Sequence, residues 1–281
     1  MEESTVEIAE KPAEKKVKKE RVWEIDFLRG VCILLMVADH IMFDLWQFPY
    51  WVANFDGVNN AFFNKAAAFA ENYWEWGVRE AVRLVVVFIF LTLSGISCSL
   101  SRSNDKRLIK LAAAALLLSV VTLSADAVMN LGVSIVWGIL HIMAFSLLVY
   151  VLLKKVFPNK YLYLGIGAAL IAVGLTPPFT AAPYSYDITF KSFFEAVLGT
   201  LYLGADSYGI APYTGIFLVG AYLGEAFYSG KKSLLPALGG KWSKPVEFVG
   251  RNTIWVYLGH QVLVFTLVMA IGLMCGYKIE L

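Results

Sequence analysis

Seven apolar segments, each long enough to cross a lipid bilayer, dominate this sequence. They lie at about residues 27–46, 83–101, 108–127, 132–153, 160–176, 209–228 and 252–275. Of the 281 residues, 58% are hydrophobic and only 16% are charged, which is typical of a polytopic membrane protein. Because backbone groups inside a bilayer must be hydrogen-bonded within the protein, the pattern predicts an all-α bundle of about seven transmembrane helices.

The distribution of Lys and Arg predicts the orientation of this bundle. With the first loop outside, 18 basic residues lie on the side of the N-terminal tail and five lie opposite. Positive charge concentrates on the cytoplasmic side of membrane proteins, so the N-terminus is expected in the cytoplasm and the C-terminus outside. The five residues on the opposite side are Lys65, Arg79, Arg83, Lys191 and Lys278.

The chain divides into a tail and one membrane domain. Residues 1–22 are polar and Lys-rich, so we expect a disordered basic cytoplasmic tail that leads into an uncleaved first span. Residues 23–281 form a single transmembrane domain. Two outer segments, 47–82 and 177–208, are rich in aromatic residues and are expected either to anchor in the interface or to form the rim of an acceptor pocket. Within the second segment, the apolar piece at 192–203 is too short to cross.

The first span carries a polar stripe. At about 100° per residue, Asp26, Arg29, His40 and Asp44 fall within an arc of about 60°, whereas Asp39 lies on another face. Arg29 and His40 are eleven residues apart, which is about 16 Å along a helix. An extended ligand would therefore reach both side chains. Ionisable residues inside a membrane segment indicate function rather than packing.

All three histidines, His40, His141 and His260, lie near the middle of predicted spans, so they are expected to meet at one depth. The structural alternative is that each one only hydrogen-bonds a neighbouring helix. The three cysteines lie in apolar runs and are expected to be small packed side chains, with no zinc-type spacing. Neither a metal nor nucleic acid is expected as a partner.

Two other functional classes fit the same residues. A proton-coupled transporter also needs buried His and Asp groups, although the chain shows no internal repeat. A haem or metal protein would use two of the histidines as ligands. A purely structural scaffold would not require an ionisable stripe in its first helix.

Four motifs together resemble the bacterial members of the heparan-α-glucosaminide N-acetyltransferase catalytic-domain family. These are W-E-I-D-F-L-R-G with a later His and F-D-L at 23–45, F-I-F-L-T-L-S-G-I-S at 88–97, G-I-L-H at 138–141 and G-R-N-T-I-W-V-Y-L-G-H-Q at 250–261. More distantly, Arg29 with His40, and Arg107 with Lys110, are similar to elements of the acyltransferase-3 proteins. The sequence departs from these patterns at Trp137, at Gly259 and at Lys110, which replaces a second arginine.

The resemblance implies transfer of an acyl group, expected to be acetyl, from cytoplasmic acetyl-CoA to a hydroxyl or amine of an outer acceptor. An envelope glycan, a lipid-linked sugar or a small metabolite would fit as the acceptor. The resemblance also implies a multi-pass protein of the bacterial inner membrane, in contact with lipid. Self-association is left open.

Residue roles follow as hypotheses. Arg29, Arg107 and Lys110 are expected near the cytoplasmic face, where their charges would hold the phosphates of CoA. His40 is the expected base, or the nucleophile of a transient acyl-imidazole. Asp44, one turn further along the same face, is expected to orient the His40 ring in preference to Asp39. His141 and His260 are expected to polarise the acyl oxygen or to position the acceptor.

Overall fold

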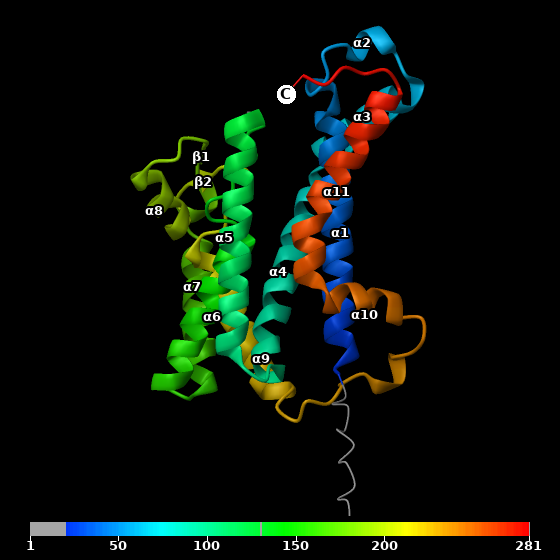
Figure 1. Cartoon of the computed structure of the whole chain (residues 1–281). Helices are drawn as coiled ribbons and strands as arrows, with labels where there is room; N and C mark the ends of the chain where they lie inside the picture. The colour runs from blue at the N-terminus through cyan, green and yellow to red at the C-terminus, as the bar shows by residue number, and fades with distance from the viewer. Residues whose placement is uncertain (1–20, 130, 281) are drawn as a thin grey trace, which may run out of the picture.

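Seven long helices form where the seven apolar segments lie in the sequence (Figure 1). The computed structural model describes residues 21–129 and 131–280, so most of the predicted tail lies outside the described residues. The long helices are α1 (Trp23–Gln47), α4 (Gly77–Leu100), α5 (Asn104–Met129), α6 (Ile139–Val156), α7 (Lys160–Gly174), α9 (Ile210–Phe227) and α11 (Thr253–Met274). The all-α prediction is confirmed.

Five of these helices, α4, α5, α6, α9 and α11, are long and apolar enough to cross a membrane. The other two are α1, with 25 residues and several charged side chains, and α7, with 15 residues. The span count of seven therefore stays a prediction.

One predicted span begins seven residues too early. The fourth span was expected from residue 132, whereas α6 begins at Ile139. Asp126, near the end of α5, accepts hydrogen bonds from the backbone N–H groups of Gly132 and Val133. Because these bonds satisfy the backbone of the turn locally, the apolar residues after it form a loop instead of a helical turn.

Shorter elements fill the connections. The first outer segment holds η1 (Phe48–Tyr50), α2 (Phe55–Val58) and α3 (Ala61–Glu75), and the second holds η2 (Phe179–Ala181), β1 (Tyr184–Ser185), α8 (Phe190–Leu198) and β2 (Tyr202–Leu203). Strands β1 and β2 are parallel, with Tyr184 opposite Tyr202. The loop before α11 holds η3 (Pro236–Leu238) and α10 (Lys244–Arg251). Helix α8 has nine residues, too few to cross a bilayer.

Helix α4 joins two groups of helices. On one side α1 packs against α3, α10 and α11, and on the other α5, α6, α7 and α9 pack together, with α4 lying extensively along α9. The contact between α4 and α9 is close because it has glycines on both helices: a Cβ at Gly95 would overlap the carbonyl oxygen of Phe217, and one at Gly220 would overlap that of Thr92. Small residues of this kind let helix backbones approach in a membrane.

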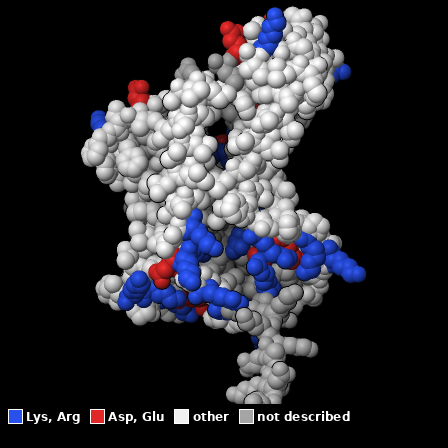
Figure 2. Space-filling view, in the orientation of Figure 1, with Lys and Arg blue, Asp and Glu red and all other residues white. Residues whose placement is uncertain are grey.

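The two ends of the bundle differ in charge. Helix α1 begins at one end and α11 finishes at the other (Figure 1), as an odd number of spans requires. Lys and Arg side chains gather around the end where α1 begins (Figure 2), which we call the basic end. Figure 2 also shows an opening through the other half of the molecule, between the sides formed by α5 and α11.

Candidate active site

His40 and His260 meet where α1 packs against α11. Their ring centroids are 4.7 Å apart and the ring planes are perpendicular. In each ring, Nδ1 lies within hydrogen-bond distance of a carbonyl oxygen of its own helix, Met36 at 2.9 Å for His40 and Tyr257 at 2.6 Å for His260. Since a carbonyl only accepts, Nδ1 carries the proton and Nε2 keeps its lone pair. Two of the three histidines thus come together, each with a basic Nε2.

The two rings differ in exposure. His40 is half-buried, whereas His260 is 8% exposed. Within residues 21–129 and 131–280, the buried Nε2 of His260 has no hydrogen-bond partner. His40 is therefore the more accessible ring of the pair.

The sequence predicts that Asp44 orients the His40 ring, but the structure shows a different partner for this carboxylate. The Asp44 side chain is fully buried and accepts a hydrogen bond of 2.7 Å from Nε2 of Gln261, the residue after His260. The Met36 carbonyl occupies the one N–H of the His40 ring, so the ring has no donor left for Asp44. The carboxylate instead links α1 to α11 beside the histidine pair.

Asp39, which precedes His40 on α1, belongs to a separate network. It accepts two hydrogen bonds from Arg79, at 2.8 and 2.7 Å, and one of 2.9 Å from the Tyr73 hydroxyl. The Arg79 guanidinium also lies 3.5 Å from the centre of the Trp74 ring. Burial, together with the Asp39 carboxylate, raises the pKa of Tyr73. The network joins α1 to α3 and α4, and it accounts for the acidic residue that lies off the polar stripe.

His141 lies apart from the other two histidines. Its Nδ1 accepts a hydrogen bond from the Gly138 backbone N–H at 3.2 Å, which places the ring proton on Nε2, 3.0 Å from the Ser119 hydroxyl. Both nitrogens are therefore engaged in joining the start of α6 to α5. This geometry favours a structural role over the predicted catalytic one.

We expect His141→Ala to destabilise the protein without slowing acetyl transfer per folded molecule. Removing the ring leaves the Gly138 N–H and the Ser119 hydroxyl without this partner, at a cost of about 1–3 kcal/mol. Thermal unfolding and the specific activity of the same purified sample would measure the two effects. A large loss of specific activity at unchanged stability would restore the catalytic assignment.

At the basic end, two arginines converge on one turn of α4. Arg29 donates to the Ser97 hydroxyl. Arg107 donates to the Ser94 hydroxyl at 2.6 Å and to the Ser94 carbonyl at 2.9 Å. Ser94 and Ser97 are one helical turn apart, so the two guanidinium groups are neighbours. Lys110 is exposed and forms no ion pair within the described residues.

A second network, of ion pairs between acidic and basic side chains, lies where α1 crosses α10. Asp26 pairs with Arg29 at 3.1 Å and also with Arg251 at 3.7 Å. Arg251 in turn donates to Glu247 at 2.6 Å. Burial acts to raise the pKa of Glu247, but the hydrogen bonds from Ser243 and Arg251 outweigh it and hold the pKa below its usual value. Arg251 lies in the G-R-N-T-I-W motif, but the sequence pattern does not predict that it pairs with Asp26 on α1.

A pocket of about 300 Å³ lies in the first outer segment, away from the basic end. Its wall combines aromatic rings with an amide and a carboxylate, and is formed by Trp46, Pro49, Tyr50, Phe55, Asn64, Ala67, Ala68 and Glu71. Trp46 also stacks on Trp74, which lies against Arg79, so this pocket adjoins the Asp39 network. Across residues 21–129 and 131–280, no three His, Cys, Asp or Glu side chains come together in a way that could hold a metal ion.

Comparison with known proteins places these features in one family. The family model described as heparan-alpha-glucosaminide N-acetyltransferase, catalytic, matches residues 21–262, a range that contains every site residue named above from Arg29 to Gln261. Neither the curated proteins nor the solved structures gave a match to this chain. The chain belongs to the heparan-α-glucosaminide N-acetyltransferase catalytic-domain family of membrane acetyltransferases.

Proposed function

We propose that this protein transfers an acetyl group from acetyl-CoA, bound at the basic end, to a hydroxyl or amine of a sugar-like acceptor on the other side of the membrane. The observation that carries the proposal is the half-buried His40, whose Nε2 keeps its lone pair beside His260. The setting would be the cell membrane, as a multi-pass protein of the bacterial inner-membrane type.

His40 can act by two routes that use the same lone pair. In direct transfer, Nε2 takes the acceptor's proton while the acceptor oxygen or nitrogen attacks the thioester carbonyl carbon. The C–S bond breaks, a C–O or C–N bond forms, and the proton passes on to the CoA thiolate. In double displacement, Nε2 attacks the carbonyl carbon itself, the C–S bond breaks and CoA leaves as the thiolate. The acceptor then attacks the acetyl-imidazole, the N–C bond breaks, and the acceptor's proton ends on the CoA thiolate. Both routes need the Met36 carbonyl to keep the proton on Nδ1.

His260 and Asp44 are positioning residues in this proposal. The His260 ring packs against the His40 ring, and the bond between Asp44 and Gln261 fixes α11 against α1 at the same level. Both therefore act by setting the direction of the His40 lone pair. Conformational freedom at this ring would lower the fraction of molecules in a reactive geometry.

On the donor side, the neighbouring guanidinium groups of Arg29 and Arg107 supply positive charge for the phosphates of CoA. Arg29 forms an ion pair with Asp26, whereas the hydrogen-bond partners of Arg107 among the described residues are neutral. Guanidinium groups bind phosphate oxygens through charge-assisted hydrogen bonds. Since Arg29 and His40 are eleven residues apart on α1, about 16 Å, the pantetheine arm would run along this helix towards the imidazole.

On the acceptor side, we place a sugar-like molecule at the outer pocket. Trp46 and Tyr50 offer aromatic faces, while Asn64 and Glu71 offer hydrogen-bonding groups. Trp46 is six residues beyond His40 on α1, about 9 Å along the helix. The opening on this half of the molecule (Figure 2) would give an acceptor access from the same side.

Calorimetric titration of acetyl-CoA into detergent-purified protein tests the donor half of this proposal. We expect saturable binding by the wild type and affinity lowered about 10-fold or more in Arg29→Ala, because a hydrogen bond to a charged group contributes about 1.5–3 kcal/mol. The double variant Arg107→Ala, Lys110→Ala should weaken binding as well. Lys65→Ala removes a positive charge from α3, at the other end of the bundle, and should bind like the wild type.

Folded wild-type protein that does not bind acetyl-CoA would contradict the proposal and would favour a proton-coupled transporter. Equal losses in Arg29→Ala and Lys65→Ala would show that net charge alone, and not this site, controls the binding. The thermal unfolding curve of each variant separates weaker binding from loss of fold.

A further inference from the structure

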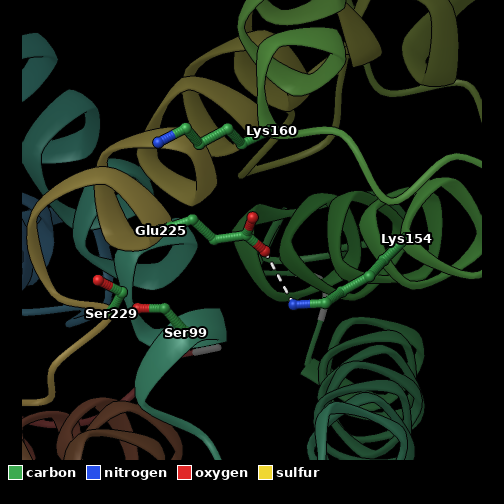
Figure 3. Close-up of a pocket in the computed structure, with 5 residues that line it drawn as sticks. All are labelled: Ser99, Lys154, Lys160, Glu225 and Ser229. Carbon is green, nitrogen blue, oxygen red and sulfur yellow. Dashed lines mark hydrogen bonds and ion pairs between the residues drawn. The ribbon is translucent and has the colours of Figure 1, made fainter.

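A second pocket, of about 280 Å³, opens at the basic end between four helices (Figure 3). It lies where α4, α6, α7 and α9 approach one another, and its wall consists of Ser99, Lys154, Lys160, Glu225 and Ser229. None of these residues belongs to the donor site predicted from the sequence. The pocket is at the small end of the range for ligand sites, so it suits one group of a larger ligand.

One of the two lysines in this pocket is already paired. Lys154 donates to Glu225 at 2.8 Å and to the Tyr150 hydroxyl at 3.0 Å, and Tyr150 donates to the same Glu225 oxygen at 2.9 Å (Figure 3 shows the ion pair). Tyr150 is fully buried. This triad holds the Lys154 ammonium at the wall and balances the charge of Glu225.

The second lysine leaves the pocket with a net positive charge. Lys160 is half-buried at the first position of α7, and within the described residues it forms no ion pair. With Lys154 and Glu225 balancing each other, the Lys160 ammonium remains for a ligand. The hydroxyls of Ser99 and Ser229 lie on the opposite part of the wall (Figure 3). The Ser99 hydroxyl already donates to the Ile96 carbonyl at 2.8 Å. The Lys160 ammonium and the Ser229 hydroxyl therefore provide the donors that a phosphate group accepts from.

The pocket adjoins the two arginines of the donor site. Arg107 lies 3.6 Å from the Cys98 sulfur, and Cys98 precedes Ser99 on α4. The turn of α4 that holds Arg29 and Arg107, at Ser94 and Ser97, therefore ends at the wall of this pocket. A molecule with several phosphates would contact the arginines with one part and the pocket with another.

We propose that this pocket binds a terminal phosphate monoester, and that in this protein the group is the 3′-phosphate of CoA. The inference rests on the proposed function and refines its donor site: the arginines face the pyrophosphate, and Lys160 faces the 3′-phosphate. The phosphate of an anionic lipid headgroup, a diester in phosphatidylglycerol, would accept hydrogen bonds from the same donors, so the test must distinguish it from the CoA phosphate.

The test compares acetyl-CoA with 3′-dephospho-acetyl-CoA, by titration into protein reconstituted in nanodiscs of zwitterionic lipid. We expect Lys160→Ala to weaken acetyl-CoA binding about 10-fold or more. The same variant should bind the dephospho compound within about twofold of the wild type, because the group that Lys160 contacts is missing. Lys155→Ala is the matched control, since Lys155 pairs with Asp105 at 3.8 Å and does not line the pocket.

Several outcomes would overturn the assignment. A Lys160→Ala protein that binds both compounds like the wild type, or loses affinity for both equally, excludes a 3′-phosphate contact while leaving the proposed function intact. A thermal stabilisation by phosphatidylglycerol that Lys160→Ala abolishes, at unchanged acetyl-CoA affinity, would assign the pocket to lipid. Wild-type protein that binds neither compound would instead contradict the proposed function itself.

Discussion

Replacement of His40 by glutamine is expected to lower the rate of acetyl transfer by at least about 10²-fold, the usual lower limit for losing a general acid–base group. The amide keeps a polar side chain of similar size but offers no basic nitrogen. Acetyl-CoA affinity should change little, because the contacts proposed for its phosphates lie about 16 Å away along α1. Initial rates of CoA release at saturating acetyl-CoA, with a panel of amino sugars as acceptors, would measure the effect.

The control for this experiment is His260→Gln. Because His260 acts through the His40 ring, its loss should lower kcat less than the loss of His40 does, with KM for acetyl-CoA unchanged. A His40→Gln protein that folds normally and transfers acetyl groups at the wild-type rate would remove His40 from the mechanism. The thermal unfolding of both variants should be recorded alongside.

Replacement of Gly250 by valine is expected to separate α10 from α1 and to disrupt the basic end. A Cβ at Gly250 would overlap the carbonyl oxygen of Asp26, and a Cβ at Gly30 would overlap that of Val246, so the two backbones meet through glycines. Backbone cannot rotate away as a flexible side chain can. The cost should exceed the roughly 1–3 kcal/mol of ordinary overpacking. Because Asp26 also pairs with Arg29 of the proposed donor site, acetyl-CoA binding should weaken as well.

Thermal unfolding of the purified protein tests this prediction. A loss of about 3 kcal/mol corresponds to a fall of roughly 6–12 °C in Tm for a chain of this size. Gly165→Val on α7 is the matched control, because a Cβ there meets no atom of the described residues within 4 Å. Unchanged unfolding of Gly250→Val would show that the crossing is looser than the structure indicates.

The sequence predicts the helices well because each one is a long apolar segment. It predicts their ends less well when a polar side chain competes for the backbone. Asp126 lies in a helix but bonds the N–H groups of the loop beyond, so α6 begins later than the hydropathy alone suggests. The aromatic and apolar pattern of residues 47–82 predicts an amphipathic helix, which forms as α3, whereas the apolar piece at 192–203 does not predict the short helix α8.

The candidate site shows the limit of single-helix reasoning. The shared face of Asp26 and Arg29 is enough to predict their ion pair, because both residues belong to one helix. Asp44 shares the face of His40, yet its partner is Gln261 on another helix, and periodicity in α1 does not reveal which helix will pack there. Likewise, the three histidines have similar predicted depths in the membrane, so depth alone does not show which of them meet. His141 lies between α5 and α6, whereas the other two form a pair between α1 and α11.

The most direct test of the central claim is acetyl transfer across a membrane. Protein would be reconstituted in one orientation in liposomes, with radiolabelled acetyl-CoA on the side of the basic end and a terminal amino sugar on the other side. We predict labelled acetylated sugar only in the compartment that holds the sugar, and none when His40→Gln replaces the wild type. Equal rates of labelled product from both proteins would contradict the role of His40. Product that forms only when donor and acceptor share one compartment would contradict transfer across the membrane.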